Sequence, residues 1–124
     1  MKSDIATLQD IQWVITQFYE KLLNDAQMRP FFEAILKQDQ LEHHIQIIAH
    51  FWSDILFDTH LYHENVMQKH LQKNAMIPFE KDHFERWASY FITTIDAYFE
   101  GIKATTMKQR ALSIKTVMQL KMHS

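Results

Sequence analysis

Apolar residues recur along most of this chain at the three- and four-residue spacing of amphipathic helices. Thr7, with Asp10 three residues later, forms a capping-box pattern that predicts the start of the first helix. The apolar stripe that follows consists of Ile11, Val14, Ile15, Phe18, Tyr19, Leu22 and Leu23. The stripe ends at Asn24, and Pro30, which suits a first helical position, predicts a short second helix through Leu36.

The middle of the chain predicts one long helix and one short one. Asp39, with Glu42 three residues on, is the expected cap of a helix over residues 41–55. Its inward positions are Leu41, His44, Ile45, Ile48, Phe51, Trp52 and Ile55. Residues 57–62 lack periodicity and are expected to connect it to a short helix over about 63–71, after which the pattern breaks before Pro78.

Two further helices are predicted in the last third of the chain. The first runs from about Phe79 to Phe99, and Gly101 fits just past its end. Its inward stripe is Phe84, Trp87, Ala88, Phe91, Ile95 and Tyr98. The second covers about residues 103–121, with the inward stripe Ala104, Met107, Ala111, Ile114, Val117 and Met118.

Composition supports this all-α reading and narrows the chemistry. A chain of 124 residues predicts one domain, over residues 1–124. One Gly and two Pro are too few for a sheet protein with many tight turns. A single Gly also excludes the dinucleotide fingerprint, the phosphate loop and the nucleophile elbow, each of which needs several. The absence of Cys excludes disulfides, thiol catalysis and Cys-ligated metals.

Charge adds little about partners. The net charge is −2, although residues 101–124 carry five basic and no acidic side chains. No aromatic residue interleaves with these charges, so a solvated helix face is favoured over a nucleic-acid or membrane surface. No apolar run approaches the roughly 18 residues of a membrane span, and no N-terminal targeting pattern is visible. A cytoplasmic protein without nucleic-acid or membrane partners is therefore expected.

Two histidines, His44 and His70, fall on the apolar stripes of different predicted helices. A histidine on an apolar face is usually a hydrogen-bonded core residue, and the alternative is a metal ligand. Beside His70, Val66 and Met67 offer the flat hydrocarbon surface that packs under a porphyrin whose iron an imidazole ligates. On other inward faces Tyr19 and Trp87 could donate hydrogen bonds to a ligand that takes up negative charge.

Two other interpretations remain open at this point. His60 with Glu64, and His50 with Asp54, have the spacing of ligand pairs in hemerythrin-like di-iron oxygen carriers. Those proteins also need two histidines four residues apart, and this chain has none. In the other interpretation the chain is a heme-free helical module that binds a partner protein, and its aromatic residues form an ordinary core. No inward carboxylate pair and no serine triad indicates a catalytic residue.

The order of these features resembles the truncated (two-on-two) hemoglobins, most closely their third group. The residues that carry the resemblance are Phe18-Tyr19, Phe32 after Pro30, His44, Phe51-Trp52, His70 and Trp87. It covers about residues 8–120, and the single glycine agrees with a group that lacks the glycine pairs of the other two. The implied fold is a globin-like, two-on-two helical sandwich around heme b.

The resemblance also implies a role for each matching residue. His70 would be the proximal ligand of the iron, with Val66 and Met67 beside the porphyrin and Lys69 near a propionate. Phe32 would wedge the heme at its corner, and Trp52 would back the pocket.

On the other side of the heme, the resemblance implies that Tyr19 and Trp87 hydrogen-bond a bound ligand. His44 would stand at the gate and Ile48 beside the ligand. The implied function is reversible binding of dioxygen or another diatomic gas. Nitric-oxide dioxygenation or peroxidase-like activity would require an external reductase as partner.

Overall fold

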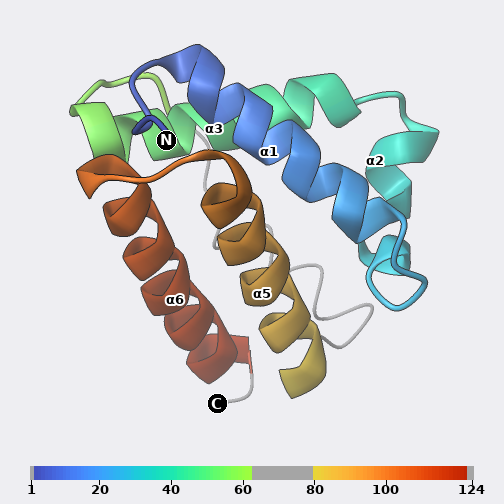
Figure 1. Cartoon of the computed structure of the whole chain (residues 1–124). Helices are drawn as coiled ribbons and strands as arrows, with labels where there is room; N and C mark the ends of the chain where they lie inside the picture. Colours follow the sequence, from blue (N-terminus) through green and yellow to red (C-terminus); the bar gives the residue numbers. More distant parts are fainter. Residues whose placement is uncertain (1, 63–79, 123–124) are drawn as a thin grey trace.

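The structure is a computed structural model that describes residues 2–62 and 80–122, and helices dominate it (Figure 1). The elements are α1 (Leu8–Leu23), the 3-10 helix η1 (Arg29–Phe32), α2 (Glu33–Lys37), α3 (Leu41–Phe57), α5 (Lys81–Tyr98) and α6 (Ile102–Met122). In this part of the chain the β structure is one isolated bridge between Ser3 and Phe99. The all-α prediction is confirmed. The helix expected at residues 63–71 lies outside the described residues.

Two helix pairs make up the fold. α1 packs on α3, and α5 packs on α6, while α1 also contacts α5 and so joins the two pairs. In Figure 1 α1 and α3 lie across the upper part of the molecule, and α5 and α6 run side by side below them. None of the helices within residues 2–62 and 80–122 is long and apolar enough to cross a membrane.

The helix starts follow the predicted signals at α1 and depart from them at α3. α1 begins with the expected capping box, in which Asp10 N–H donates to Thr7 Oγ1 at 3.1 Å. The prediction that Asp39 caps α3 is wrong, because Gln40 is the N-cap. Asp39 has a φ of 55°, and its N–H donates to the carbonyl of Leu36, so it forms the turn between α2 and α3. Asp tolerates this left-handed conformation better than most residues.

α5 starts slightly later than expected, at Lys81 instead of Phe79. A reciprocal pair of hydrogen bonds between Glu80 and His83 caps it, since Glu80 N–H donates to His83 Nδ1 at 2.8 Å. At its other end the chain turns sharply through Gly101, as the sequence predicted, with a φ of 142°.

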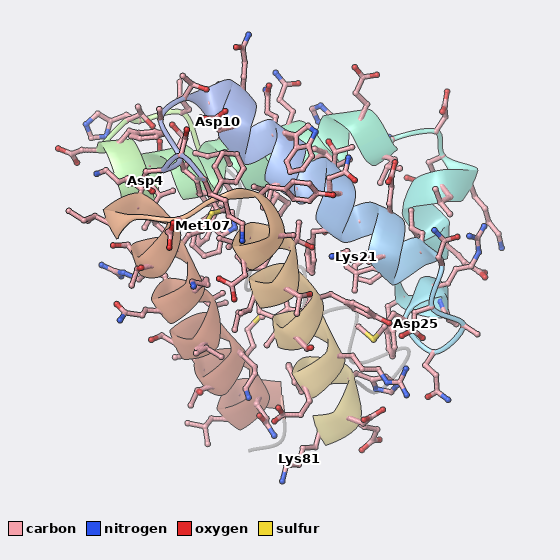
Figure 2. All side chains as sticks on the ribbon, in the orientation of Figure 1. Asp4, Asp10, Lys21, Asp25, Lys81 and Met107 are labelled. Atoms are coloured by element: carbon pink, nitrogen blue, oxygen red, sulfur yellow. The ribbon has the colours of Figure 1, made fainter. Side chains whose placement is uncertain are left out.

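The N-terminal segment closes this α5–α6 corner. The Asp4 carboxylate accepts hydrogen bonds from the backbone N–H groups of Lys103 and Ala104, both at 2.9 Å, and thereby caps α6 (Figure 2). These bonds and the Lys103 charge lower the pKa of Asp4 against the opposing effect of burial. A Cβ at Gly101 would lie 2.5 Å from Asp4 Cγ, so the corner has no room for a larger residue.

The core lies where the two helix pairs meet, and it contains most of the predicted inward stripes. Two predicted inward residues are instead exposed: Tyr98 at 49% and Val117 at 41%. Tyr98 packs edge-on against Trp13 at the surface, with ring centroids 4.2 Å apart. Val117 belongs to a helix with aliphatic residues on several faces, because Ile102, Leu112 and Leu120 are exposed as well. In α6 periodicity therefore identifies most of the buried stripe, including Ala104, Met107, Ala111 and Met118, but is wrong about Val117.

Candidate functional site

Tyr19 lies where α1, α3 and η1 meet. Its side chain is buried, and its hydroxyl shares a 2.7 Å hydrogen bond with His44 Nε2 on α3. The Phe32 ring, from η1, packs edge-on against Tyr19 with centroids 5.4 Å apart. Burial raises the pKa of Tyr19 far above its usual value of 10, so the hydroxyl keeps its proton at neutral pH. The site therefore holds a permanent O–H group in an aromatic setting.

Trp87, on α5, reaches the same cluster from the opposite helix pair. It is half-buried and stacks on Phe91 with an interplanar angle of 2°. Its ring also packs edge-on against Phe18, with centroids 5.9 Å apart. The Phe18 ring in turn packs edge-on against the Tyr19 ring, with centroids 5.4 Å apart. Tyr19 and Trp87, which lie far apart in the sequence, thus flank one phenylalanine.

α3 supplies the wall next to these residues. Ile48 and Trp52 are buried one and two turns beyond His44 on the same helix. Trp52 stacks on Phe91 with centroids 5.2 Å apart, and Phe51 packs edge-on against Trp52. The residues predicted for the distal side (Tyr19, His44, Ile48 and Trp87) accordingly form one connected cluster with Phe32 and Trp52, which were predicted for the corner and the back of the pocket.

Phe91 is the central residue of this cluster, and the sequence marked it only as an inward position of α5. It contacts Trp52, Trp87 and Phe18, and the Phe18 contact has centroids 5.0 Å apart. Its place in the middle of an apolar stripe predicted burial but no role for it. A second feature missed by sequence reasoning is the hydrogen bonding of Asp25 to Arg86 and Tyr90 on α5. A separation of more than sixty residues leaves no local signal for it.

The proximal residues stay predictions. His70, Val66, Met67 and Lys69 lie outside the described residues. The structure does describe the chain up to Tyr62. Asp54 accepts hydrogen bonds from the N–H groups of Leu61 and Tyr62, at 2.9 and 3.0 Å, and so folds the chain back along the end of α3.

The di-iron interpretation gains no support from the described residues. The Asp54 carboxylate, one member of the proposed His50–Asp54 pair, is occupied by Thr59 Oγ1 at 2.5 Å and by the two backbone N–H groups. Glu64, the partner of His60, lies outside the described residues. Within residues 2–62 and 80–122 no three metal-ligating side chains come together.

Comparison with known proteins supports the fold. No protein-family model matches the sequence, and no curated protein matches it. Among solved structures, the chain matches the crystal structure of the group III truncated hemoglobin from Campylobacter jejuni with a TM-score of 0.86. The two sequences are 24% identical, and the match covers 98% of this chain and 95% of the other. This chain therefore has the two-on-two fold of the truncated globins, as its sequence predicted.

Proposed function

We propose that this protein is a group III truncated hemoglobin that binds heme b and, on its distal side, dioxygen or another diatomic ligand. The observation that carries the proposal is the buried, protonated Tyr19 hydroxyl in an aromatic cluster with His44 and Trp87. The fold of the chain, which matches that of a truncated hemoglobin, supports it.

The composition of the described side supports binding of a large flat cofactor. Its wall is made of aromatic and aliphatic side chains, chiefly Phe32, Ile48, Phe51 and Trp52. The cluster's side-chain polar groups are the Tyr19 hydroxyl, the His44 imidazole and the indole N–H groups of Trp52 and Trp87. Cofactor pockets have this composition, an apolar lining with a few polar groups that orient the ligand.

The roles assigned to the remaining residues follow from the family resemblance. His70 would ligate the iron, Val66 and Met67 would pack against the macrocycle, and Lys69 would reach a propionate. Phe32 would wedge the cofactor at the η1 corner, and Trp52 would close the back of the pocket. When bound, the heme would supply an iron atom that binds a diatomic gas.

The chain's own contribution is a pair of hydrogen-bond donors, one buried and one half-buried. The Tyr19 hydroxyl is fixed by burial, and in the described structure it is engaged with His44. If the half-buried His44 side chain moved so that its Nε2 atom no longer contacted Tyr19, the Tyr19 hydroxyl would be released for an incoming ligand. The Trp87 indole N–H is the second donor. Two donors favour a ligand that takes up negative charge, because charge-assisted hydrogen bonds are the stronger ones.

An absorption spectrum of the purified protein tests the proposal directly. We expect an intense Soret band in the ferric protein that moves on reduction and moves again with carbon monoxide. His70→Ala should lose stable heme and regain it when imidazole is supplied, whereas His60→Ala serves as the matched control and should keep it. Retention of wild-type heme binding by His70→Ala would remove the proximal assignment.

A protein that shows no Soret band even after hemin is added would leave the heme-free, partner-binding interpretation. The exposed aliphatic residues of α6, chiefly Ile102 at 81% and Leu120 at 67%, would then be its candidate contact surface.

Nitric-oxide dioxygenation or peroxidase-like turnover by the heme protein would need electrons from an external reductase. Steady-state assays with and without an added reductase test that activity.

A further inference from the structure

A carboxylate at the end of α1 attaches this helix to α5. Asp25 lies in the loop that follows α1 (Figure 2), and its side chain is only 7% exposed. Its Oδ2 atom accepts a hydrogen bond from the Tyr90 hydroxyl at 2.6 Å and another from Arg86 Nη1 at 2.9 Å. Its Oδ1 atom accepts the backbone N–H of Gln27 at 2.8 Å. A buried carboxylate with three donors is held in one position.

The backbone of Asp25 is held just as firmly. Its N–H donates to the carbonyl of Leu22 in the last turn of α1, and its own carbonyl accepts from the N–H groups of Met28 and Arg29. Arg29 is the first residue of η1, the helix that carries Phe32 to Tyr19. The hydrogen bond from Tyr90 has the largest effect on the pKa of Asp25, and the hydrogen bonds from Gln27 and Arg86 add to it. Together they outweigh burial, which raises the pKa, and they lower it to about 2. Asp25 is therefore charged at neutral pH and belongs rigidly to α1 and the η1 corner.

The two α5 partners lie on one stripe of that helix. Arg86 and Tyr90 are four residues apart and face the same side of α5. Trp87 directly follows Arg86, and Phe91 directly follows Tyr90. Two attachments on one stripe fix both the rotation of a helix about its axis and its sliding along that axis. The neighbouring stripe is thereby turned toward Phe18, which lies 5.9 Å from Trp87 and 5.0 Å from Phe91 between ring centroids.

The other contacts between α1 and α5 are less directional. They include edge-on aromatic pairs such as Phe18 with Phe91 and Trp13 with Tyr98. Aromatic pairs are favourable over a range of offsets, whereas hydrogen bonds to a carboxylate weaken steeply when they are misaligned. In the described part of the chain, the ion pairs of α5 that involve Asp96 and Glu85 join it to α6 and leave its register on α1 unaffected.

We propose that Asp25 is a positioning residue, which fixes the rotation and register of α5 on α1 and thereby places the Trp87 indole against Phe18, the ring that also contacts Tyr19. This inference rests on the proposed function, since it concerns the geometry of the distal donors. Asp25 is not a ligand contact itself. It acts through Arg86 and Tyr90, which bracket Trp87 within about one turn of α5.

The test compares Asp25→Asn, Tyr90→Phe and a control, Asp4→Asn, with the wild type. Asn at position 25 removes the charge and replaces one acceptor oxygen with an NH₂ donor that faces another donor in either orientation of the amide, and Tyr90→Phe removes only one hydroxyl. Asp4→Asn weakens the α6 cap far from the distal side and controls for a general loss of stability. The readouts are the C–O infrared band and the Trp87 indole N–H resonance of the carbon monoxide complex, together with the dioxygen dissociation rate. Trp87→Phe assigns the resonance.

Asp25→Asn and Tyr90→Phe should shift the infrared band and the indole resonance in the same direction. They should speed dioxygen dissociation by at least about threefold. The double variant should resemble the stronger single one, because both changes remove the same interaction. Asp4→Asn should lower the unfolding midpoint and leave the three distal readouts at wild-type values. Tyr90→Phe keeps the aromatic ring, so it still tests the proposal if Asp25→Asn does not fold.

Two results separate failure of this inference from failure of the proposed function. If the wild type binds heme but neither variant moves the distal readouts more than Asp4→Asn does, Asp25 is only a stabilising residue. If the wild type binds no heme, the proposed function is wrong, and the Trp87 resonance of the heme-free protein still tests Asp25. An unchanged resonance in both variants would then overturn the positioning role.

Discussion

Replacing Tyr19 with Phe isolates the contribution of one hydroxyl to ligand binding. Tyr19→Phe keeps the ring, so the edge-on contacts with Phe18 and Phe32 and the packing of the core are preserved. The substitution removes the atom that lies 2.7 Å from His44 Nε2 and that we propose to face the bound ligand. It therefore changes hydrogen bonding without opening a cavity.

The expected effects on stability and on ligand release differ in size. A neutral hydrogen bond contributes about 0.5–1.5 kcal/mol to folding, and His44 is half-buried and can be rehydrated, so the cost should lie at the low end. A hydrogen bond to a charged acceptor is worth about 1.5–3 kcal/mol, which corresponds to a roughly 10- to 150-fold change in rate. Dioxygen dissociation should therefore be faster by a factor in that range.

Stopped-flow displacement of dioxygen by carbon monoxide measures the dissociation rate, and urea unfolding measures the stability. Tyr98→Phe is the matched control, because this tyrosine is 49% exposed and lies at the far end of α5. It should leave both quantities unchanged. A dissociation rate of Tyr19→Phe equal to that of the wild type would refute the assignment of Tyr19 as a distal donor.

Three further predictions concern the fold that supports the site. Gly101→Ala should destabilise the protein by about 1–3 kcal/mol in urea unfolding, since φ is 142° and a Cβ would clash with Asp4; an unchanged midpoint would contradict this account of the corner. Phe91→Ala should cost about 3–5 kcal/mol, because the ring is fully buried between Trp52, Trp87 and Phe18, and a smaller loss would mean that the cluster collapses into the space. The pKa of Asp25 is lowered to about 2 from an unfolded value near 3.9, so its contribution to stability is fully present above pH 4 and is lost as the pH falls toward 2. Asp25→Asn should accordingly weaken the acid dependence of the urea midpoint between pH 4 and 2, and an identical pH profile would contradict the shift.

Local signals in the sequence predicted the helices well where capping and periodicity agree. The Thr7–Asp10 capping box and the stripe from Ile11 to Leu22 predicted both the start and the buried face of α1. The same reasoning was wrong where a residue serves a neighbouring turn, as Asp39 does between α2 and α3. It was also wrong about Val117 in α6, because apolar residues occupy several faces of that helix.

The comparison with a solved truncated hemoglobin confirms the fold that was expected from a few ordered residues. Those residues could be recognised because each is a large aromatic residue or a histidine, and because their order and spacing along the predicted helices are those of the family. Their roles toward heme stay proposals, and His70 lies outside the described residues. The sequence offered no way to see that Phe18 and Phe91 join Tyr19, Trp87 and Trp52 into one cluster.

The sequence by itself determined the all-α class, most helix limits and most of the inward faces of α1, α3, α5 and α6, because these depend on residues three or four positions apart. Only the tertiary structure decided which helices meet, and it alone paired Tyr19 with His44 and Asp25 with Arg86 and Tyr90. Contacts between residues distant in the chain depend on how whole helices pack, and helical periodicity carries no information about the partner that covers an apolar face.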